Sequence, residues 1–377
     1  MPRLAELVRQ LEDHYDPSWA EPWDAVGLVC GDPDADVQRV LFAVDPVEAV
    51  VDEAIAAGAG LLVTHHPLFL GGTTSVAATT AKGRVVHRLL AAGIGLYVAH
   101  TNADVAAPGV SDALGETLGL RDLRPLQSRP GEAQDKIVTF VPSDAVDRVL
   151  DAMSAAGAGT IGDYSRCAFL TEGSGTFRAG PNTNPTVGEP GQVTQAPEVR
   201  VEMVAPRSAR SAVLLGLLAV HPYEEPAWDV HELAALPGGR GLGRVGKLPA
   251  PTSLSAFTDH VAASLPRTAW GVRAAGDPDR VVRTVAVCGG SGGDLADAAG
   301  RAGADVLVTS DLKHHATSET IADGGVALVD AAHWATEWPW LRAAAGILAT
   351  TVETSVSETV TDPWTLHARP TTPAEGP

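Results

Sequence analysis

Two segments of this chain repeat the same order of buried strands and amphipathic helices. Apolar runs alternate with helical patterns in both segments, at residues 40–45, 59–67 and 94–100 and again at 282–290, 304–315 and 326–337. The stretch AGAGLLVTHH aligns without gaps on AGADVLVTSD. Strands that alternate with helices in this way are typical of parallel sheets covered on both faces. The repeat predicts the α/β class, with two duplicated, mainly parallel halves that form one core.

A segment of different composition separates the two halves. From about residue 130 it alternates strand and helix patterns around a Gly-, Pro- and Thr-rich stretch, GSGTFRAGPNTNPTVGEPGQVTQAP. We interpret residues 130–236 as an inserted α+β domain and PGGRGLGR, which follows it, as the hinge where the chain returns to the core. The two halves of the core are then residues 1–129 and 237–370, and residues 371–377 are expected to form a flexible tail.

Composition excludes several classes of protein. The 377 residues are 45% hydrophobic and 19% charged, with no apolar run near the roughly 20 residues that span a bilayer. A net charge of -19 repels phosphate backbones, so we expect no nucleic-acid partner. The amphipathic N-terminus lacks the apolar core of a signal peptide, and three scattered cysteines predict no disulfide. We therefore expect a cytoplasmic protein that does not bind membranes.

Potential metal ligands cluster where the predicted strands end. His65 and His66 end one strand, Asp104 follows another, and His333 with Glu337 follows the equivalent strand of the second half. Ligands of open α/β sheets gather at the carboxyl ends of the strands, so these five side chains are expected to meet. The i, i+4 spacing of the last pair places both groups on one helix face.

This donor set favours two metal ions over one. Adjacent histidines on a strand end point in different directions, so His65 and His66 suit two neighbouring ions better than one shared ion. Glu337 could bridge such a pair at the separation of about 3.5 to 4 Å that is typical of hydrolytic centres. Mixed nitrogen and oxygen ligands fit Zn, Fe and Mn equally well. The sequence predicts two divalent ions per chain.

Other polar residues near these strand ends could contact a substrate. His100 and His315 are candidates for acid–base groups, or for side chains that support the ligands. In the internal repeat, Asp311 aligns with His66, and Lys313 lies just beyond it. They could bind a polar substrate, although a solvated loop pair explains them equally well.

Two glycine-rich stretches have different meanings. Gly241, Gly243 and Gly246 match the GxGxxG pattern, but prolines follow where a helix should begin, so we do not expect a dinucleotide site. The second stretch, CGGSGGD, lies between a predicted strand and a helix. Its backbone N–H groups could hold an anion, or its glycines could serve a tight turn. The residues concerned are Gly290, Ser291 and Gly292.

The motifs together resemble the NIF-three-like dinuclear-metal-centre family, also named GTP cyclohydrolase 1 type 2 homologs. The matching stretches, in family order, are PWDAVGLVCGD, VTHHP, AHTNADVAAPGVSDALGETLGL, CGGSGGD, TSDLKHH and AAHWATE. The resemblance implies metal ligands at His65, His66, Asp104, His333 and Glu337, and a homohexamer. It also implies a CutA-like or PII-like, ferredoxin-like insert. Departures from the usual family pattern fall at Ala25, Ser310 and His314.

Two classes of function follow from these features. The first is a metal-dependent hydrolase acting on a small phosphorylated or nucleotide-like substrate, with GTP ring opening as one version implied by the resemblance. The second is a noncatalytic metal-binding scaffold or regulator whose inserted domain senses a ligand.

Overall fold

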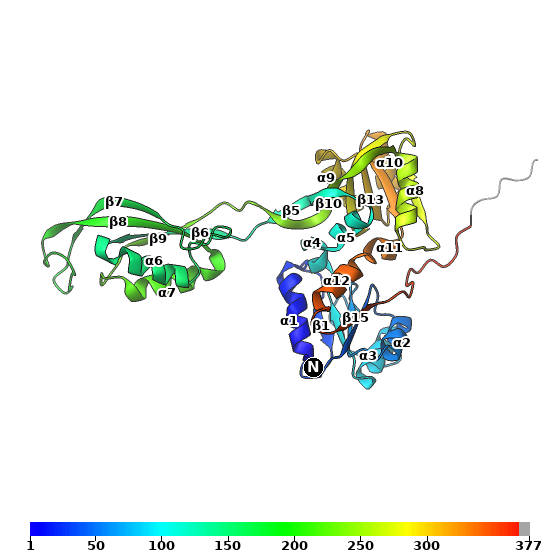
Figure 1. The fold of residues 1–377 in the computed structure, drawn as a ribbon, viewed down its shortest axis with the longest axis horizontal. Helices are drawn as coiled ribbons and strands as arrows, with labels where there is room; N and C mark the ends of the chain where they lie inside the picture. The colour runs from blue at the N-terminus through cyan, green and yellow to red at the C-terminus, as the bar shows by residue number, and fades with distance from the viewer. Residues whose placement is uncertain (369–377) are drawn as a thin grey trace, which may run out of the picture. The chain divides into compact units, whose positions relative to one another are not determined.

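The protein is described by a computed structural model that covers residues 1–368, so the predicted tail at 371–377 lies outside the described residues. The chain divides into two compact units (Figure 1). One combines Met1–Arg129 with the chain from Gly239 onward, and the other is Pro130–Gly238. We refer to them as the core unit and the insert. None of the described helices is long and apolar enough to cross a membrane.

The core unit contains two mixed sheets. The first has the order β1-β4-β3-β2-β15, and only β1 runs antiparallel to its neighbour. Its strands are β1 (Gly27–Cys30), β2 (Arg39–Ala43), β3 (Leu61–Thr64), β4 (Gly95–Val98) and β15 (Glu353–Val356). The second sheet has the order β11-β14-β13-β12-β10-β5. Its strands are β5 (Arg121–Pro130), β10 (Pro237–Ser253), β11 (Val272–Ala275), β12 (Val281–Ser291), β13 (Val306–Ser310) and β14 (Ala327–Ala331).

The duplication extends further than the sequence pattern predicted. In each half a helix is followed by a strand that pairs antiparallel with the last of three parallel strands, and two helices follow that last strand. The helices of the first half are α1 (Leu4–His14), α2 (Glu48–Ala56), α3 (Ala81–Ala91), α4 (Thr101–Val105) and α5 (Val110–Thr117). Those of the second are α8 (Leu254–Ser264), α9 (Ala296–Arg301), α10 (His314–Ala322), α11 (His333–Glu337) and α12 (Trp340–Leu348). The α/β class is confirmed, with antiparallel strands that the repeat did not reveal.

Each half contributes a strand to the sheet of the other. Strand β15, which follows α12 in the second half, pairs in parallel with β2 of the first sheet. Strand β5, which follows α5 in the first half, lies at the edge of the second sheet. The two halves are therefore joined through their sheets as well as through the chain.

Apolar side chains cover both faces of the parallel strands. In β2, Val40 and Phe42 pack into a central core with α1, α8 and α12, whereas Leu41 and Ala43 pack with α2 and α3 on the opposite face. Strand β12 alternates in the same way between the central core and α9. Because successive side chains of a strand point to opposite faces, an uninterrupted apolar run is needed to fill both cores. The central core thus joins the two sheets.

The insert forms a sheet of order β7-β8-β6-β9, and all of its neighbouring strands are antiparallel. Helices α6 and α7 pack on one face of this sheet (Figure 1). The element order is β-α-β-β-α-β, that of a split β-α-β motif. Its elements are β6 (Gln134–Val141), α6 (Val146–Ala155), β7 (Phe169–Arg178), β8 (Val193–Pro206), α7 (Arg210–Val220) and β9 (Trp228–Glu232).

Two glycine-rich segments lie in strands. The predicted hinge PGGRGLGR contains the boundary between the two units, at Gly238 and Gly239, and forms the first part of β10, between β12 and β5. Its GxGxxG pattern therefore lies within a strand and opens no helix. Part of the Gly- and Thr-rich stretch of the insert extends β7 to Arg178 and starts β8 at Val193. All three cysteines are free, as predicted.

The insert should be removable. The N–H of Gly131 donates to the carbonyl of Leu236 at 2.8 Å, so the chain enters and leaves the insert at adjacent points that a short linker can join. We expect a core unit lacking residues 131–236 to stay soluble and to bind the same amount of metal as the full chain. Circular dichroism and elemental analysis would check this. Loss of both solubility and metal would show that the core needs the insert.

Candidate metal centre

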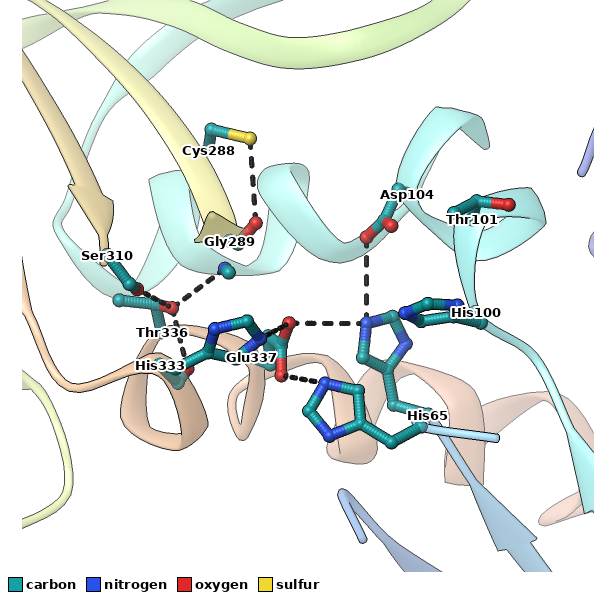
Figure 2. A network of polar contacts seen from close by, with 12 residues as sticks. His65, His100, Thr101, Asp104, Cys288, Gly289, Ser310, His333, Thr336 and Glu337 are labelled. Atoms are coloured by element: carbon teal, nitrogen blue, oxygen red, sulfur yellow. Dashed lines mark hydrogen bonds and ion pairs between the residues drawn. The ribbon is translucent and has the colours of Figure 1, made fainter. Parts of the chain in front are cut away.

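The predicted ligands meet at the carboxyl ends of strands from both sheets. His65 and His66 directly follow β3, and Asp104 lies on α4, just after β4. His333 and Glu337 form the ends of α11, the short helix after β14. Figure 2 shows His65, Asp104, His333 and Glu337 directed toward one another from these separate elements. The site therefore requires both halves of the duplicated core.

Glu337 lies at the middle of this cluster. Its carboxylate is 3% exposed. The Oε1 atom is 2.9 Å from Nε2 of His333 and 3.5 Å from Nε2 of His65, and Oε2 is 3.0 Å from Nε2 of His66 (Figure 2). On the far side, Nε2 of His65 is 3.7 Å from Oδ1 of Asp104. One carboxylate thus faces three imidazoles, which is the geometry that a bridging ligand needs.

Acceptors on the other ring nitrogen orient each of these histidines. Nδ1 of His65 donates to the backbone carbonyl of Ala99 at 2.9 Å. Nδ1 of His66 pairs with Asp45 at 2.7 Å, and Nδ1 of His333 with Asp311 at 2.5 Å. A carbonyl or carboxylate oxygen can only accept, so the proton stays on Nδ1 and Nε2 of the neutral ring keeps its lone pair. Metal-binding histidines are held in this way.

The electrostatics of the cluster favour positive charge. Burial lowers the pKa of His66, but the carboxylates of Glu337 and Asp45 outweigh it and raise the pKa to about 11. His333 shows the same balance between burial and the carboxylates of Glu337 and Asp311, and its pKa rises to about 9. Burial alone would raise the pKa of Glu337, yet the surrounding histidines hold it well below its usual value. An ionised carboxylate at this depth needs cations around it.

Two atoms of the cluster have no hydrogen-bond partner. Within the described chain, Nε2 of His65 and Oε2 of Glu337 belong to the few buried polar side-chain atoms without one. Oε2 lies at ion-pair distance from Nε2 of His66 but makes no hydrogen bond. Leaving such a group unsatisfied costs about 1–3 kcal/mol. Divalent ions bound by imidazole nitrogen and carboxylate oxygen would satisfy both atoms, so the donors fit a metal.

His100 lies beside the predicted ligands. One ring nitrogen from each of His65, His66 and His100 lies within 4.8 Å of the other two. Donor atoms of His66, His333 and Glu337 form a second group of the same kind. Nδ1 of His100 pairs with Asp24 at 2.9 Å. His66 belongs to both groups, so the two groups adjoin.

Sequence reasoning assigned no role to two carboxylates that support these rings. Asp24 holds His100 and also accepts from the N–H of Thr101 at 3.0 Å. Asp45, the partner of His66, directly follows the buried strand pattern VLFAV. The strand-end rule that selected the histidines could therefore have found Asp45. Asp24 precedes β1, and its contact with His100 depends on how this segment packs against α4.

Gly290 brings the backbone of β12 against the centre. A Cβ atom there would lie 2.5 Å from Oε1 of Glu337, and its φ of 66° also favours glycine. The N–H of Gly290 donates to Oγ1 of Thr336, and that of Gly292 to Oγ1 of Thr309. These two N–H groups are therefore engaged inside the turn, which favours the tight-turn interpretation over an anion cradle. Ser291, between them, is exposed at the end of β12.

The remaining candidates separate in the structure. Asp311 contacts the cluster through His333. Lys313 is exposed and directly precedes α10, and the ring of His315 packs on that of His314 at a centroid distance of 5.2 Å. In the part of the chain that the structure describes, His315 belongs to neither group of candidate metal donors. This placement does not test the assignment of His315 as an acid–base group, which stays a prediction.

A cleft of about 320 Å³ opens beside the cluster. His66 and His333 line it together with their carboxylate partners, Asp45 and Asp311. The rest of the lining comes mainly from the segment after β14 and from the C-terminal residues 361–364. A small molecule in this cleft would lie next to the two histidines.

The chain is similar to proteins of one family over nearly its whole length. A family model described as Duf34/NIF3 (NGG1p interacting factor 3) matches residues 2–363. A Mycobacterium leprae protein named "GTP cyclohydrolase 1 type 2 homolog" is 48% identical over 97% of this chain and 96% of its own length. A Streptomyces coelicolor protein of the same name is 40% identical over 100% and 99%.

Solved structures show the same similarity. A Bacillus cereus protein related to NIF3 is 35% identical, with a TM-score of 0.78 over 97% of this chain and 99% of its own. A Staphylococcus aureus protein is 29% identical, with a TM-score of 0.83 over the same shares. The resemblance drawn from the motifs is thereby confirmed, and the chain belongs to the Duf34/NIF3 family.

Proposed function

We propose that this protein binds two divalent metal ions and acts as a metal-dependent hydrolase on a small phosphorylated or nucleotide-like substrate. The observation that carries the proposal is the buried Glu337 carboxylate, which faces Nε2 atoms of three histidines. His65, His66, Asp104, His333 and Glu337 would hold the ions. The name of the relatives makes GTP ring opening one version of this activity.

The chain's own residues have distinct tasks in such a reaction. The bound ions would lower the pKa of a coordinated water. Ala99, Asp45 and Asp311 keep the three histidine rings oriented through Nδ1. His100, held by Asp24 beside His65 and His66, is placed to take up a proton at Nε2. The adjacent cleft would hold the substrate.

The alternative is a noncatalytic scaffold or regulator with a ligand-sensing insert. A specific observation supports it: the insert has its own cleft of about 580 Å³, lined by residues of β7 and β8 and by the segments 183–187 and 223–225. This volume suits a small molecule. The β-α-β-β-α-β order agrees with a CutA-like or PII-like, ferredoxin-like insert, and a homohexamer of the whole chain is part of either proposal.

Turnover separates the two functions. Purified full-length protein is tested against nucleotides and phosphoesters with Mn, Fe or Zn and after chelation. We expect metal-dependent hydrolysis that falls at least 100-fold in His66→Ala, since this ring lines both the centre and the cleft. His87→Ala, a change on α3, is the matched control. Metal-replete protein without turnover on any of these substrates would favour the scaffold.

Metal content tests the centre itself. We expect about two divalent ions per chain after purification without chelator, because five donors with two adjacent histidines suit two ions that share Glu337. Inductively coupled plasma mass spectrometry gives the ratio. One ion or none per chain in metal-replete protein would contradict the dinuclear assignment.

Glu337 should be the most damaging ligand to lose. Glu337→Gln keeps the size of the side chain but removes the anion between both ions, so we expect affinity for both to fall by at least tenfold. Asp104→Asn and His65→Ala should each lower the affinity for mainly one ion. Competition with a fluorescent chelator measures the affinities, with Glu319→Gln on the exposed face of α10 as control. Wild-type affinity in Glu337→Gln would exclude the bridging role.

A further inference from the structure

The cleft beside the candidate metal centre has a wall formed by the C-terminal segment after β15. The N–H of Ser357 donates to the carbonyl of Phe42 at 2.8 Å, and its carbonyl accepts from Nε1 of Trp338 at 2.9 Å. Oγ1 of Thr361 donates to Asp45. These contacts hold the segment against the first sheet and bring residues 361–364 to the cleft.

Asp362 in this segment is a buried carboxylate in need of a donor. It is 8% exposed and lines the cleft. Its Oδ2 atom is among the described buried side-chain atoms without a hydrogen-bond partner. A carboxylate oxygen only accepts, and leaving it unpaired in the fold is costly. A ligand with an N–H group could satisfy it.

Two indole rings form an aromatic part of the same cleft. The rings of Trp270 and Trp364 lie 5.6 Å apart between centroids, with 38° between their planes. Trp364 is 59% exposed. Planar unsaturated rings of many kinds stack on such aromatic surfaces, because every such ring presents a π-face. The cleft thus combines an aromatic surface with an unpaired acceptor.

The charge of the cleft opposes a polyphosphate. None of the described residues that line it is a lysine or arginine. The two histidines of the lining, His66 and His333, already face carboxylates on both ring nitrogens. Arg273, 4.7 Å from the centroid of Trp270, is paired with Asp330. The carboxylates at and around the centre carry more negative charge than two divalent ions would supply. They belong to Asp24, Asp45, Asp104, Asp311, Glu337 and Asp362.

We propose that this cleft binds the ring of an uncharged or cationic planar nitrogen heterocycle, with an N–H of the ligand donating to Asp362 and the ring packed on Trp270 and Trp364. The volume of about 320 Å³ is near the lower end for ligand sites, which suits a base or nucleoside better than a nucleoside triphosphate. The proposal rests on the proposed function in placing this ligand next to the metal centre, and it narrows the substrate class.

Calorimetric titration of full-length, metal-loaded protein tests the proposal with matched pairs: adenosine against ATP and guanosine against GTP. We expect at least one nucleoside to bind at least tenfold more tightly than its own triphosphate. Asp362→Asn should lower the affinity for that nucleoside about tenfold, and Trp364→Ala should lower it by a similar factor. Metal content should be unchanged in both variants. The controls are Asp279→Asn, in an exposed turn, and Trp228→Ala, in the insert.

Equal or tighter binding of both triphosphates, or no binding of either nucleoside, would overturn the proposal. So would loss of metal from Asp362→Asn, because the carboxylate would then belong to the metal centre. The result of the nucleoside titration can be read separately from the number of metal ions in the centre. Protein that holds no metal but binds a nucleoside through Asp362 would retain the cleft proposal and overturn the metal one. Metal-replete protein that binds neither nucleoside would overturn the cleft proposal and retain the metal one.

Discussion

The burial of one ionised carboxylate constrains this structure more than any other interaction. Glu337 is 3% exposed and faces nitrogen atoms from His65, His66 and His333. A buried charge is stable only with opposite charge and good geometry around it. The strands before these residues must therefore end at one place, and the rings must be held by acceptors behind them. The packing of the two sheets through a common apolar core provides that convergence.

The duplicated fold explains how such convergence arises. Each half places polar residues after corresponding strands, and ligands collect at the carboxyl ends of parallel strands. The halves no longer contribute equally. The first half supplies a pair of histidines after β3. The corresponding positions in the second half are Ser310, the last residue of β13, and Asp311, which instead orients His333. At this pair of positions, the first half thus supplies two of the predicted ligands and the second half supplies a group that positions another one.

The sequence predicts the parts of this structure that depend on local pattern. Apolar runs and their repeat predict the α/β class, and strand ends predict the residues that surround Glu337. Contacts set by tertiary packing are different. Asp362 lies after the last strand in a Pro- and Thr-rich segment, and nothing in its neighbours indicates that it reaches the cleft. PGGRGLGR has the composition of a loop, yet pairing with neighbouring strands makes it part of β10, because a sheet can accept glycine where flanking residues hold the register.

The exchange of strands between the halves has a consequence for biosynthesis. Strand β2 lies beside β15, whose residues Glu353–Val356 are near the end of the chain. As the protein leaves the ribosome, the first sheet therefore keeps an unpaired edge at β2 until almost the whole chain has been translated. Open edges of this kind invite pairing with other chains. The emerging first half would be the stage most dependent on chaperones, and a premature stop before β15 would leave a protein prone to aggregate even with every metal ligand present.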